Sequence, residues 1–218
     1  MLFDLDGTLI DSTYHHALAW HRAFHGLGVA VPLYRIHRAV GMGGDKLVAQ
    51  VAGDGVEERL GDRLRAQWRE QYVGLKDEVV PLAGAAELVR RTGDAGFRVA
   101  VASSGDPEFA AEAVAMLGIG DHLAALTTSE DVEGSKPEPD LVSETLNRLP
   151  GVTHAVLVGD TPYDVTAAQR GGIGCVGLLA GGYSEAELLE AGAALVVGQP
   201  EDLHDVDWVE HCSRIPRS

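Results

Sequence analysis

From Pro81 onward, short apolar runs alternate with segments whose apolar residues recur at helical spacing. The apolar runs predict buried β-strands at 97–103, 123–129, 154–160, 175–179 and 193–197. The segments before and between them predict helices at 81–96, 106–119, 138–149, 162–172 and 184–192. Strands that alternate with helices indicate a parallel sheet covered by helices on both faces.

Residues 14–79 show a different pattern, with helical spacing throughout and no convincing strand. We therefore expect two parts, a catalytic core formed by 1–13 and 80–218 and a helical cap formed by 14–79. The predicted fold class is α/β, with a Rossmann-like parallel-sheet core and an inserted all-helical cap domain.

Composition and charge narrow the classes of function. The chain has 218 residues, is 45% hydrophobic and carries a formal charge of −16, which disfavours binding to nucleic acid or to an anionic membrane surface. Its two cysteines form no CxxC pair and it has no apolar run of about 20 residues, so we expect neither a signal peptide nor a membrane span. These features predict a cytoplasmic protein without a membrane partner.

Polar residues stand where the predicted strands end. A short apolar segment runs into the acids of "DLDG", and the later strands end in "VASS" and "VGD". Because ligands of parallel sheets bind beyond the carboxyl ends of the strands, these residues are expected to converge. They are Asp4, Asp6, Ser103, Asp160 and Asp164, joined by Lys136 from the loop "GSKPEPD". Only three residues precede Asp4, which predicts a short first strand and suggests a chain that begins upstream.

Clustered carboxylates repel one another unless a cation lies among them, and hard oxygen ligands suit Mg2+. In an Asp-x-Asp pair both side chains leave an extended chain on the same side. One of these carboxylates can therefore bind a metal and attack phosphorus while its neighbour acts as an acid and base. Gly7 gives the backbone freedom to turn away.

Taken together, these motifs resemble those of the haloacid dehalogenase superfamily of phosphotransferases. "DLDGTL" is similar to the first motif, Ser103 in "VASS" to the second, Lys136 in "SKPEPD" to the third and "GDTPYD" to the fourth. All four occur in the family's order, and a helical insertion lies between the first two. Motifs in this order make a specific signal, although each alone is weak.

The resemblance implies a role for each matching residue. Asp4 would be the nucleophile that forms an aspartyl-phosphate, and Asp6 would protonate the leaving oxygen and then activate water. Mg2+ would be held by Asp4, the main-chain carbonyl of Asp6 and Asp160, with Asp164 either a further ligand or a residue that holds the ligands. The phosphoryl oxygens would be bound by Ser103, Ser104 and Lys136.

The cap is expected to recognise the substrate. "DSTYHHALAW" resembles the start of the cap in β-phosphoglucomutase-like members, so His16 is a candidate ligand, although a plain helix around Trp20 is favoured. In the loop "GMGGDK", Gly43 and Gly44 allow close approach and Lys46 could meet a substrate carboxylate. The alternative is that this lysine points to solvent.

The favoured function is an Mg2+-dependent phosphatase acting on a small phosphorylated metabolite, with a phosphoglycolate-like substrate possible. Its oligomeric state would be monomer or homodimer. A sugar-phosphate mutase is the first alternative, disfavoured because Gly44 stands about where the mutases have an arginine for the second phosphate. A receiver-type signalling domain is the second, but such domains are much shorter and lack a cap.

Overall fold

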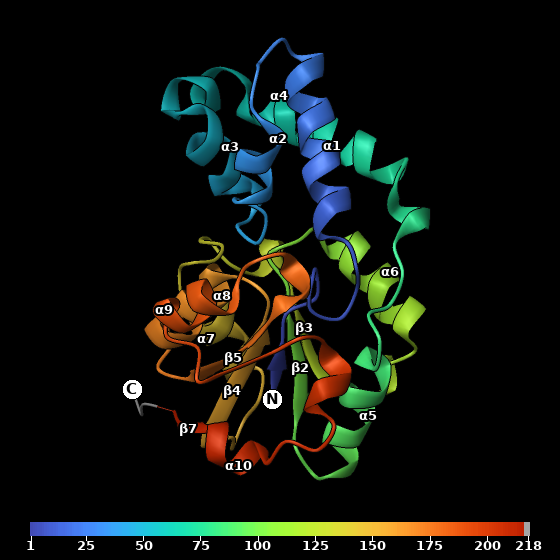
Figure 1. Cartoon of the computed structure of the whole chain (residues 1–218), viewed down its shortest axis with the longest axis vertical. Helices are drawn as coiled ribbons and strands as arrows, with labels where there is room; N and C mark the ends of the chain where they lie inside the picture. The colour runs from blue at the N-terminus through green and yellow to red at the C-terminus, as the bar shows by residue number, and fades with distance from the viewer. Residues whose placement is uncertain (216–218) are drawn as a thin grey trace.

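The computed structural model describes residues 1–215 and shows a parallel sheet between helices, with further helices above the carboxyl end of its strands (Figure 1). The strands are β1 Leu2–Phe3, β2 Val99–Ala102, β3 Leu123–Thr127, β4 His154–Gly159, β5 Gly174–Leu178, β6 Leu195–Val197 and β7 Ser213–Arg214. The core helices are α5 Ala85–Asp94, α6 Pro107–Leu117, α7 Asp140–Asn147, α8 Pro162–Arg170, α9 Glu185–Ala191 and α10 Trp208–His211. Single 3₁₀ turns follow several of these elements, among them η3 Ser129–Asp131 and η4 Leu179–Gly181.

The sheet has the order β3-β2-β1-β4-β5-β6, with β7 pairing antiparallel to β4. The strand order reverses around β1, whose Leu2 pairs with Ala100 on one side and Leu157 on the other. Such a reversal leaves a crevice at the carboxyl ends of the strands, where doubly wound sheets bind their ligands. The two residues of β1 therefore lie at the centre of this crevice.

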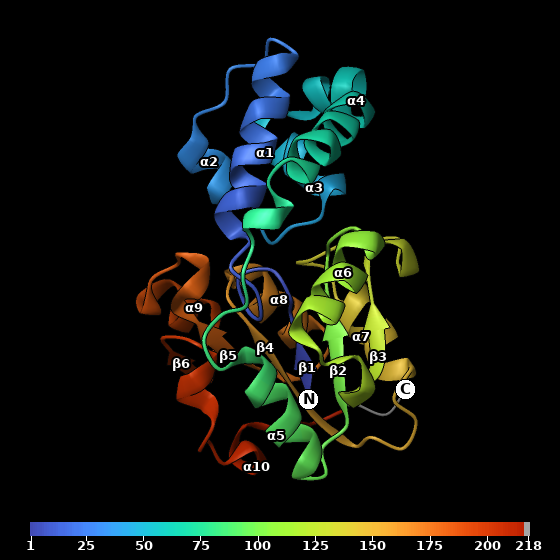
Figure 2. The same ribbon diagram turned by 90° about the vertical axis from the view of Figure 1, so that its right-hand side faces the viewer.

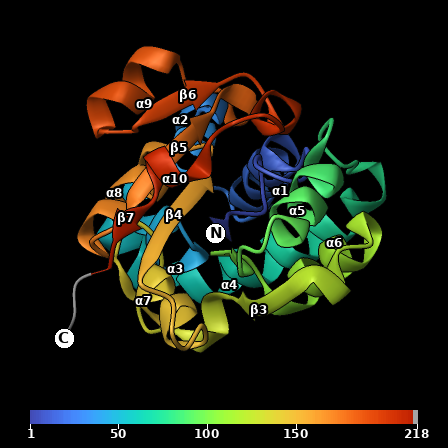
Figure 3. The same cartoon turned by 90° about the horizontal axis from the view of Figure 1, so that it is seen from below.

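Helices cover both faces of the sheet, as the buried strands require. One hydrophobic cluster joins the sheet to α5 and α6, and another joins it to α7, α8 and α9. Seen from below, these two groups lie on opposite sides of the strands (Figure 3). The strands are apolar on both faces for this reason, and the polar residues are confined to their ends.

Four helices form a separate group above the crevice, which we call the cap (Figure 2). They are α1 Thr13–Gly26, α2 Leu33–His37, α3 Gly44–Ala52 and α4 Asp54–Val73. The cap has its own hydrophobic cluster around Trp20, Phe24 and Leu64. The two segments that connect the cap to the core are hydrogen-bonded to each other. Asp11 N donates to Val80 O (2.9 Å), and Leu82 N donates to Leu9 O (3.0 Å).

The α/β fold with an inserted helical cap is confirmed, and each predicted core strand and helix has a counterpart. The boundaries drawn at 13/14 and 79/80 remain a prediction. The sequence pattern missed the short α10 and β7, because four and two residues are too few to show a period. In residues 1–215, no helix is long and apolar enough to cross a membrane.

Candidate active site

Asp4, Ser103 and Asp160 each follow directly on one of three neighbouring strands. Asp4 comes after β1 and donates its backbone N–H to Val158 O of β4 (2.8 Å). Ser103 comes after β2, and Asp160 comes after β4. Because β1 lies between β2 and β4, the sheet brings these side chains to one edge, as the sequence predicted.

Gly7 allows the chain to turn away immediately after the two acids. Its φ is +76°, and a Cβ atom built there would lie 2.4 Å from Asp160 Oδ2. A side chain at this position would therefore be strained and would also collide with the acid at the end of β4. The glycine of "DLDG" is needed both for the turn and for the close approach of two strand ends.

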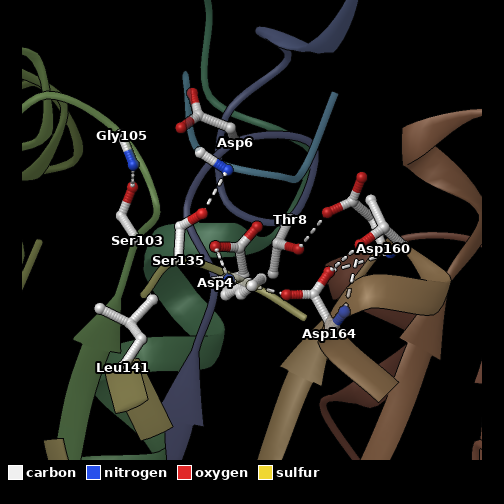
Figure 4. Close-up of polar contacts among 12 residues, drawn as sticks. Asp4, Asp6, Thr8, Ser103, Gly105, Ser135, Leu141, Asp160 and Asp164 are labelled. Carbon is white, nitrogen blue, oxygen red and sulfur yellow. Dashed lines mark hydrogen bonds and ion pairs between the residues drawn. The ribbon is translucent and has the colours of Figure 1, made fainter. Parts of the chain in front are cut away.

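Three buried carboxylates form the centre of the site. One oxygen of each of Asp4, Asp160 and Asp164 lies within 4.8 Å of the others, and all three residues are at most 4% exposed. Figure 4 shows them converging from β1, β4 and the start of α8. Asp164 is held by Thr161, whose Oγ1 donates to its Oδ2 at 2.6 Å and whose N–H donates at 3.0 Å.

Lys136 supplies the cation that faces this cluster. Its Nζ donates to Asp4 Oδ1 and lies 2.7 Å from Asp164 Oδ1, and the side chain is only 1% exposed. Burial opposes the charge on this lysine, but Asp164 and Asp4 outweigh burial and raise its pKa. The predicted meeting of Lys136 with the strand-end acids is therefore present in the structure.

One lysine does not balance three carboxylates. Burial raises the pKa of Asp4 to about 7, with Asp164 and Asp6 adding to the rise and Lys136 opposing it. Burial also raises the pKa of Asp160 well above its ordinary value, again with help from Asp164 and Asp4. The cluster therefore favours an additional cation at neutral pH.

The donor set fits a divalent metal ion. Asp160 Oδ1 accepts a hydrogen bond from Thr8 (3.0 Å), whereas Asp160 Oδ2 is buried without a hydrogen-bond partner in the described part of the chain. An orphaned carboxylate oxygen beside two other carboxylates is typical of a hard-cation site, and oxygen ligands suit Mg2+. Asp4, Asp160 and Asp164 could together bind such an ion.

The carboxylate of Asp6 is held apart from this cluster. It accepts a hydrogen bond from Ser12 Oγ (2.5 Å) and lies 2.9 Å from His16 Nε2, at the start of α1. Burial disfavours its ionised form, but the neighbouring His16 and Ser12 lower the pKa of Asp6 below its ordinary value. The predicted metal contact of Asp6 concerns its main-chain carbonyl, so this side-chain position leaves that prediction open.

His16 lies where the cap meets the core. Its ring stacks on Tyr72 at 4.1 Å between centroids, and the residue is 8% exposed. The favoured interpretation of a helix around a buried Trp20 agrees with the structure, since Trp20 is 4% exposed. The contact of His16 with Asp6 was not expected, nor was that of Ser12, because neither follows from helical spacing.

The two serines of "VASS" differ in their partners. Ser103 is fully buried and its Oγ accepts a hydrogen bond from Gly105 N (3.0 Å). The buried Oγ of Ser104 has no partner among residues 1–215. Their predicted role in binding phosphoryl oxygens remains a prediction, which their position beside Asp4 supports.

A cavity of about 480 Å³ rises from Asp4 and Asp6 into the cap. The cap lines it with Trp20, Met42 and Trp68, and the core lines it with the loop around η3. A space of this size exceeds what a phosphoryl group alone fills, so it can also hold a leaving group.

The predicted substrate-reading loop of the cap packs tightly on the core. Gly44 lines the cavity, and Gly43 N donates to Ser135 Oγ (3.1 Å). A Cβ atom on Gly43 would lie 2.5 Å from that serine, so close approach requires the glycine. Lys46 neither lines the cavity nor points freely to solvent, because its Nζ donates to Ser135 O (2.8 Å) and lies 3.4 Å from Glu138. Its role as a substrate ligand remains a prediction.

A doubly wound sheet with buried acids at its strand ends and a helical cap above them defines a haloacid-dehalogenase-type enzyme. Residues 1–178 match the family model described as haloacid dehalogenase-like hydrolase, and the chain belongs to this family. The relatives that it resembles include several proteins named phosphoglycolate phosphatase.

Individual relatives agree with this placement over nearly the whole chain. The chain is 33% identical to validoxylamine A 7'-phosphate phosphatase from Streptomyces hygroscopicus subsp. limoneus over 216 residues, which is 95% of each chain. It is 28% identical to phosphoglycolate phosphatase from Vibrio vulnificus over 200 residues, covering 87% of this chain and 86% of that one. A solved hydrolase from Pseudomonas syringae is 31% identical with a TM-score of 0.87, covering 93% of this chain and 94% of that one. The chain is thus a phosphoric monoester hydrolase of the haloacid-dehalogenase type.

Proposed function

We propose that the protein is an Mg2+-dependent phosphatase that hydrolyses a small phosphorylated metabolite through an aspartyl-phosphate at Asp4. One observation carries this proposal: Asp4 lines the cavity, pairs with Lys136 and has an oxygen within 4.8 Å of oxygens of Asp160 and Asp164. A nucleophile, a cation and a set of metal ligands therefore surround the place where a phosphoryl group would bind.

In the first step, an oxygen of Asp4 attacks phosphorus and the bond from phosphorus to the leaving oxygen breaks. Asp6, which is held in its ionised form in the free protein, would take up a proton when the ester binds and give it to that oxygen. In the second step, Asp6 takes a proton from a water molecule, the water oxygen attacks phosphorus, and the bond to Asp4 breaks. Inorganic phosphate leaves and Asp4 is regenerated.

The surrounding residues would stabilise the charge on the phosphoryl oxygens. Lys136 lies against Asp4 and can pair with these oxygens as the transition state forms, and the hydroxyls of Ser103 and Ser104 can donate to them. Mg2+, held by Asp4, Asp160 and Asp164, would supply positive charge that the rest of this acidic protein lacks. His16 and Ser12 would orient Asp6 for its proton transfers.

The names of the relatives suggest where the search for a substrate should begin. Those at 33% and 28% identity are named for validoxylamine A 7'-phosphate and phosphoglycolate, so the substrates to test first are phosphate monoesters of small polar metabolites. The leaving group would be recognised by the cap and by the core loop around η3, which together line the cavity, because the residues around Asp4 bind the phosphoryl group.

A phosphate-release assay over a panel of such esters tests this function. We expect turnover with Mg2+, none in excess chelator, and a return of activity when Mg2+ is restored. A chain with Asp4→Asn should be inactive, and the exposed neighbour Asp11→Asn serves as its matched control. Interconversion of hexose phosphates that requires glucose 1,6-bisphosphate and releases no net phosphate would favour the mutase alternative, and full activity in chelator would contradict the metal role.

A further inference from the structure

The cavity above Asp4 is lined by more acids than bases. Six carboxylate side chains line it, against two arginines, Arg65 and Arg69. The leaving group of an ester bound at Asp4 occupies this cavity, because Asp4 forms part of its wall. Whether those arginines are free to bind a substrate therefore decides which leaving groups the cavity accepts.

Arg65 is occupied by the cap itself. Its Nη1 lies 2.9 Å from Glu57 Oε1, and its Nη2 lies 2.8 Å from Asp62 Oδ1. Its Nη1 also donates to the carbonyl of Gly44 (3.0 Å). Two carboxylates and a carbonyl thus satisfy the charge and the donors that this arginine could have offered to a substrate.

Arg69 is occupied across the interface between cap and core. Its two Nη atoms pair with Asp106 and Glu108 at the start of α6. Its guanidinium also lies 4.7 Å from the centre of the Phe109 ring. This arginine links the cap to the core and, like Arg65, already faces two carboxylates.

The lysines near the cavity are also engaged. Lys136 pairs with Asp4 and Asp164 at the phosphoryl end, and Lys46, which does not line the cavity, contacts Ser135 and Glu138. Within residues 1–215, no lysine or arginine that lines the cavity is left without a carboxylate partner. An anionic leaving group would find no free cation at the cap end.

Unlike these arginines and lysines, two carboxylates on the core wall are unpaired in the described part of the chain. Glu130 in η3 and Glu133 just after it both line the cavity. In the described part of the chain, neither side chain makes an ion pair or a hydrogen bond, and both are exposed to solvent. On the cap side the cavity is lined by the neutral indoles of Trp20 and Trp68, which stack on each other at 5.4 Å between ring centroids.

We infer that the natural leaving group carries no negative charge, and that Glu130 and Glu133 favour one that bears an amine. This inference rests on the proposed function, since it assigns the substrate class of the same site. The cationic Lys136 lies beside Asp4 at the phosphoryl end, whereas the leaving-group end offers neutral indole rings and two carboxylates that are unpaired within residues 1–215. The two ends are therefore suited to opposite charges.

The inference separates candidate substrates that share a phosphoryl group. A carboxylate on the leaving group, as in phosphoglycolate, or a second phosphate would enter a space whose arginines are already paired. Burying an anion without a partner costs free energy, and nearby acids add repulsion. Neutral and amine-bearing esters avoid both costs.

A charge series of three sugar esters tests this directly. Glucosamine 1-phosphate, glucose 1-phosphate and glucuronic acid 1-phosphate share a ring and a phosphate position but carry a cationic, a neutral and an anionic leaving group. Each is measured as a competitor of p-nitrophenyl phosphate hydrolysis, so KI is obtained whether or not the ester is itself hydrolysed. We expect the glucuronic acid ester to bind about tenfold or more weakly than the glucose ester. The glucosamine ester should bind about two- to fivefold more tightly, as exposed charge pairs do.

The two glutamates are tested by a double variant, Glu130→Gln and Glu133→Gln. In this variant the KI of the glucosamine ester should become equal to that of the glucose ester. The KI of the glucuronic acid ester should exceed that of the glucose ester by a smaller factor than in the unaltered protein. Glu190→Gln, an exposed glutamate on α9 outside the cavity, is the matched control and should leave the series unchanged. A preference for glucosamine that survives the double variant would overturn the role of Glu130 and Glu133.

Failure of this inference differs from failure of the proposed function. Hydrolysis of p-nitrophenyl phosphate together with tightest binding of the glucuronic acid ester, or with no competition by any ester, would overturn the inference alone. Absence of all hydrolysis with Mg2+ would overturn the function. In that case, calorimetric titration of the same esters into Asp4→Asn still reports their order of affinity, and tightest binding of the glucuronic acid ester there would overturn the inference.

Discussion

Ser135 Oγ donates a hydrogen bond to the carboxylate of Asp45, which joins the cap to the residue just before Lys136. The same serine oxygen accepts from Gly43 N, and its carbonyl accepts from Lys46. Three neighbouring cap residues therefore contact one residue of the loop that carries the phosphoryl-binding lysine. Cap position and the position of Lys136 are coupled through this contact.

This coupling predicts the effect of Asp45→Ala. Loss of the hydrogen bond should destabilise the contact of cap and core, lowering kcat/KM for a cap-filling ester by about tenfold, the equivalent of one hydrogen bond to a charged group. Steady-state kinetics measure this, with Glu58→Ala on the exposed side of α4 as the control. Equal kinetics for the two variants would show that the contact does not matter for turnover.

Gly7 and Gly28 have nearly equal φ angles, but only Gly7 lies close to the side chain of Asp160. Comparing substitutions at the two positions therefore tests the effect of that close contact. Gly7 has φ +76° and Gly28 has φ +73°, but a Cβ atom at Gly28 would meet nothing within 4 Å. Gly28→Ala should cost about 1–2 kcal/mol of stability and leave activity intact. Gly7→Ala should cost more and also abolish activity, because its Cβ would displace Asp160. Thermal unfolding and turnover of both variants check this, and an active Gly7→Ala would contradict the assigned geometry.

Metal binding should depend on pH around neutrality. Without metal, burial and the neighbouring acids raise the pKa of Asp4 to about 7, and a metal ion requires its ionised form. The dissociation constant for Mg2+ should therefore be about tenfold lower at about pH 8 than at about pH 6, with release of protons on binding. Calorimetry in buffers of different ionisation enthalpy measures both. A dissociation constant that stays the same over this range would exclude Asp4 as a ligand.

His16 is predicted to act by positioning Asp6. The variant His16→Ala should lower kcat for alkyl phosphates about tenfold. This loss is smaller than the whole rate gain from general acid catalysis, because Asp6 itself is still present. The effect on p-nitrophenyl phosphate should be small, because that leaving group needs little protonation. His25→Ala, exposed on the same helix, is the control. A uniform loss on both substrates would point to a structural role instead.

The strand-end residues could be predicted from the sequence because sheet topology fixes where they lie. Asp4, Asp160 and Lys136 each stand in a motif next to a predicted strand or helix, and parallel strands bring such ends together. The structure places them as this reasoning requires. The short β1 was likewise predictable from the few residues before Asp4.

The contacts between cap and core could not be predicted in the same way. Lys46 was expected to meet a substrate or solvent, but it contacts Ser135, which is 89 positions away in the sequence. Arg69 and Asp106 pair across 37 positions. Such pairs depend on how one group of helices is placed over another, and helical periodicity only tells which face of a helix is apolar.

The central claim is that Asp4 becomes phosphorylated during turnover, and an acid quench tests it most directly. In Asp6→Asn the second step should be impaired, so the phosphoenzyme formed from p-nitrophenyl phosphate with Mg2+ should persist. Mass spectrometry of the quenched protein should then show one added phosphoryl group on the peptide that carries Asp4, and none after Asp4→Asn. Turnover of p-nitrophenyl phosphate by a protein that never shows this label, or a label on another residue, would contradict the account.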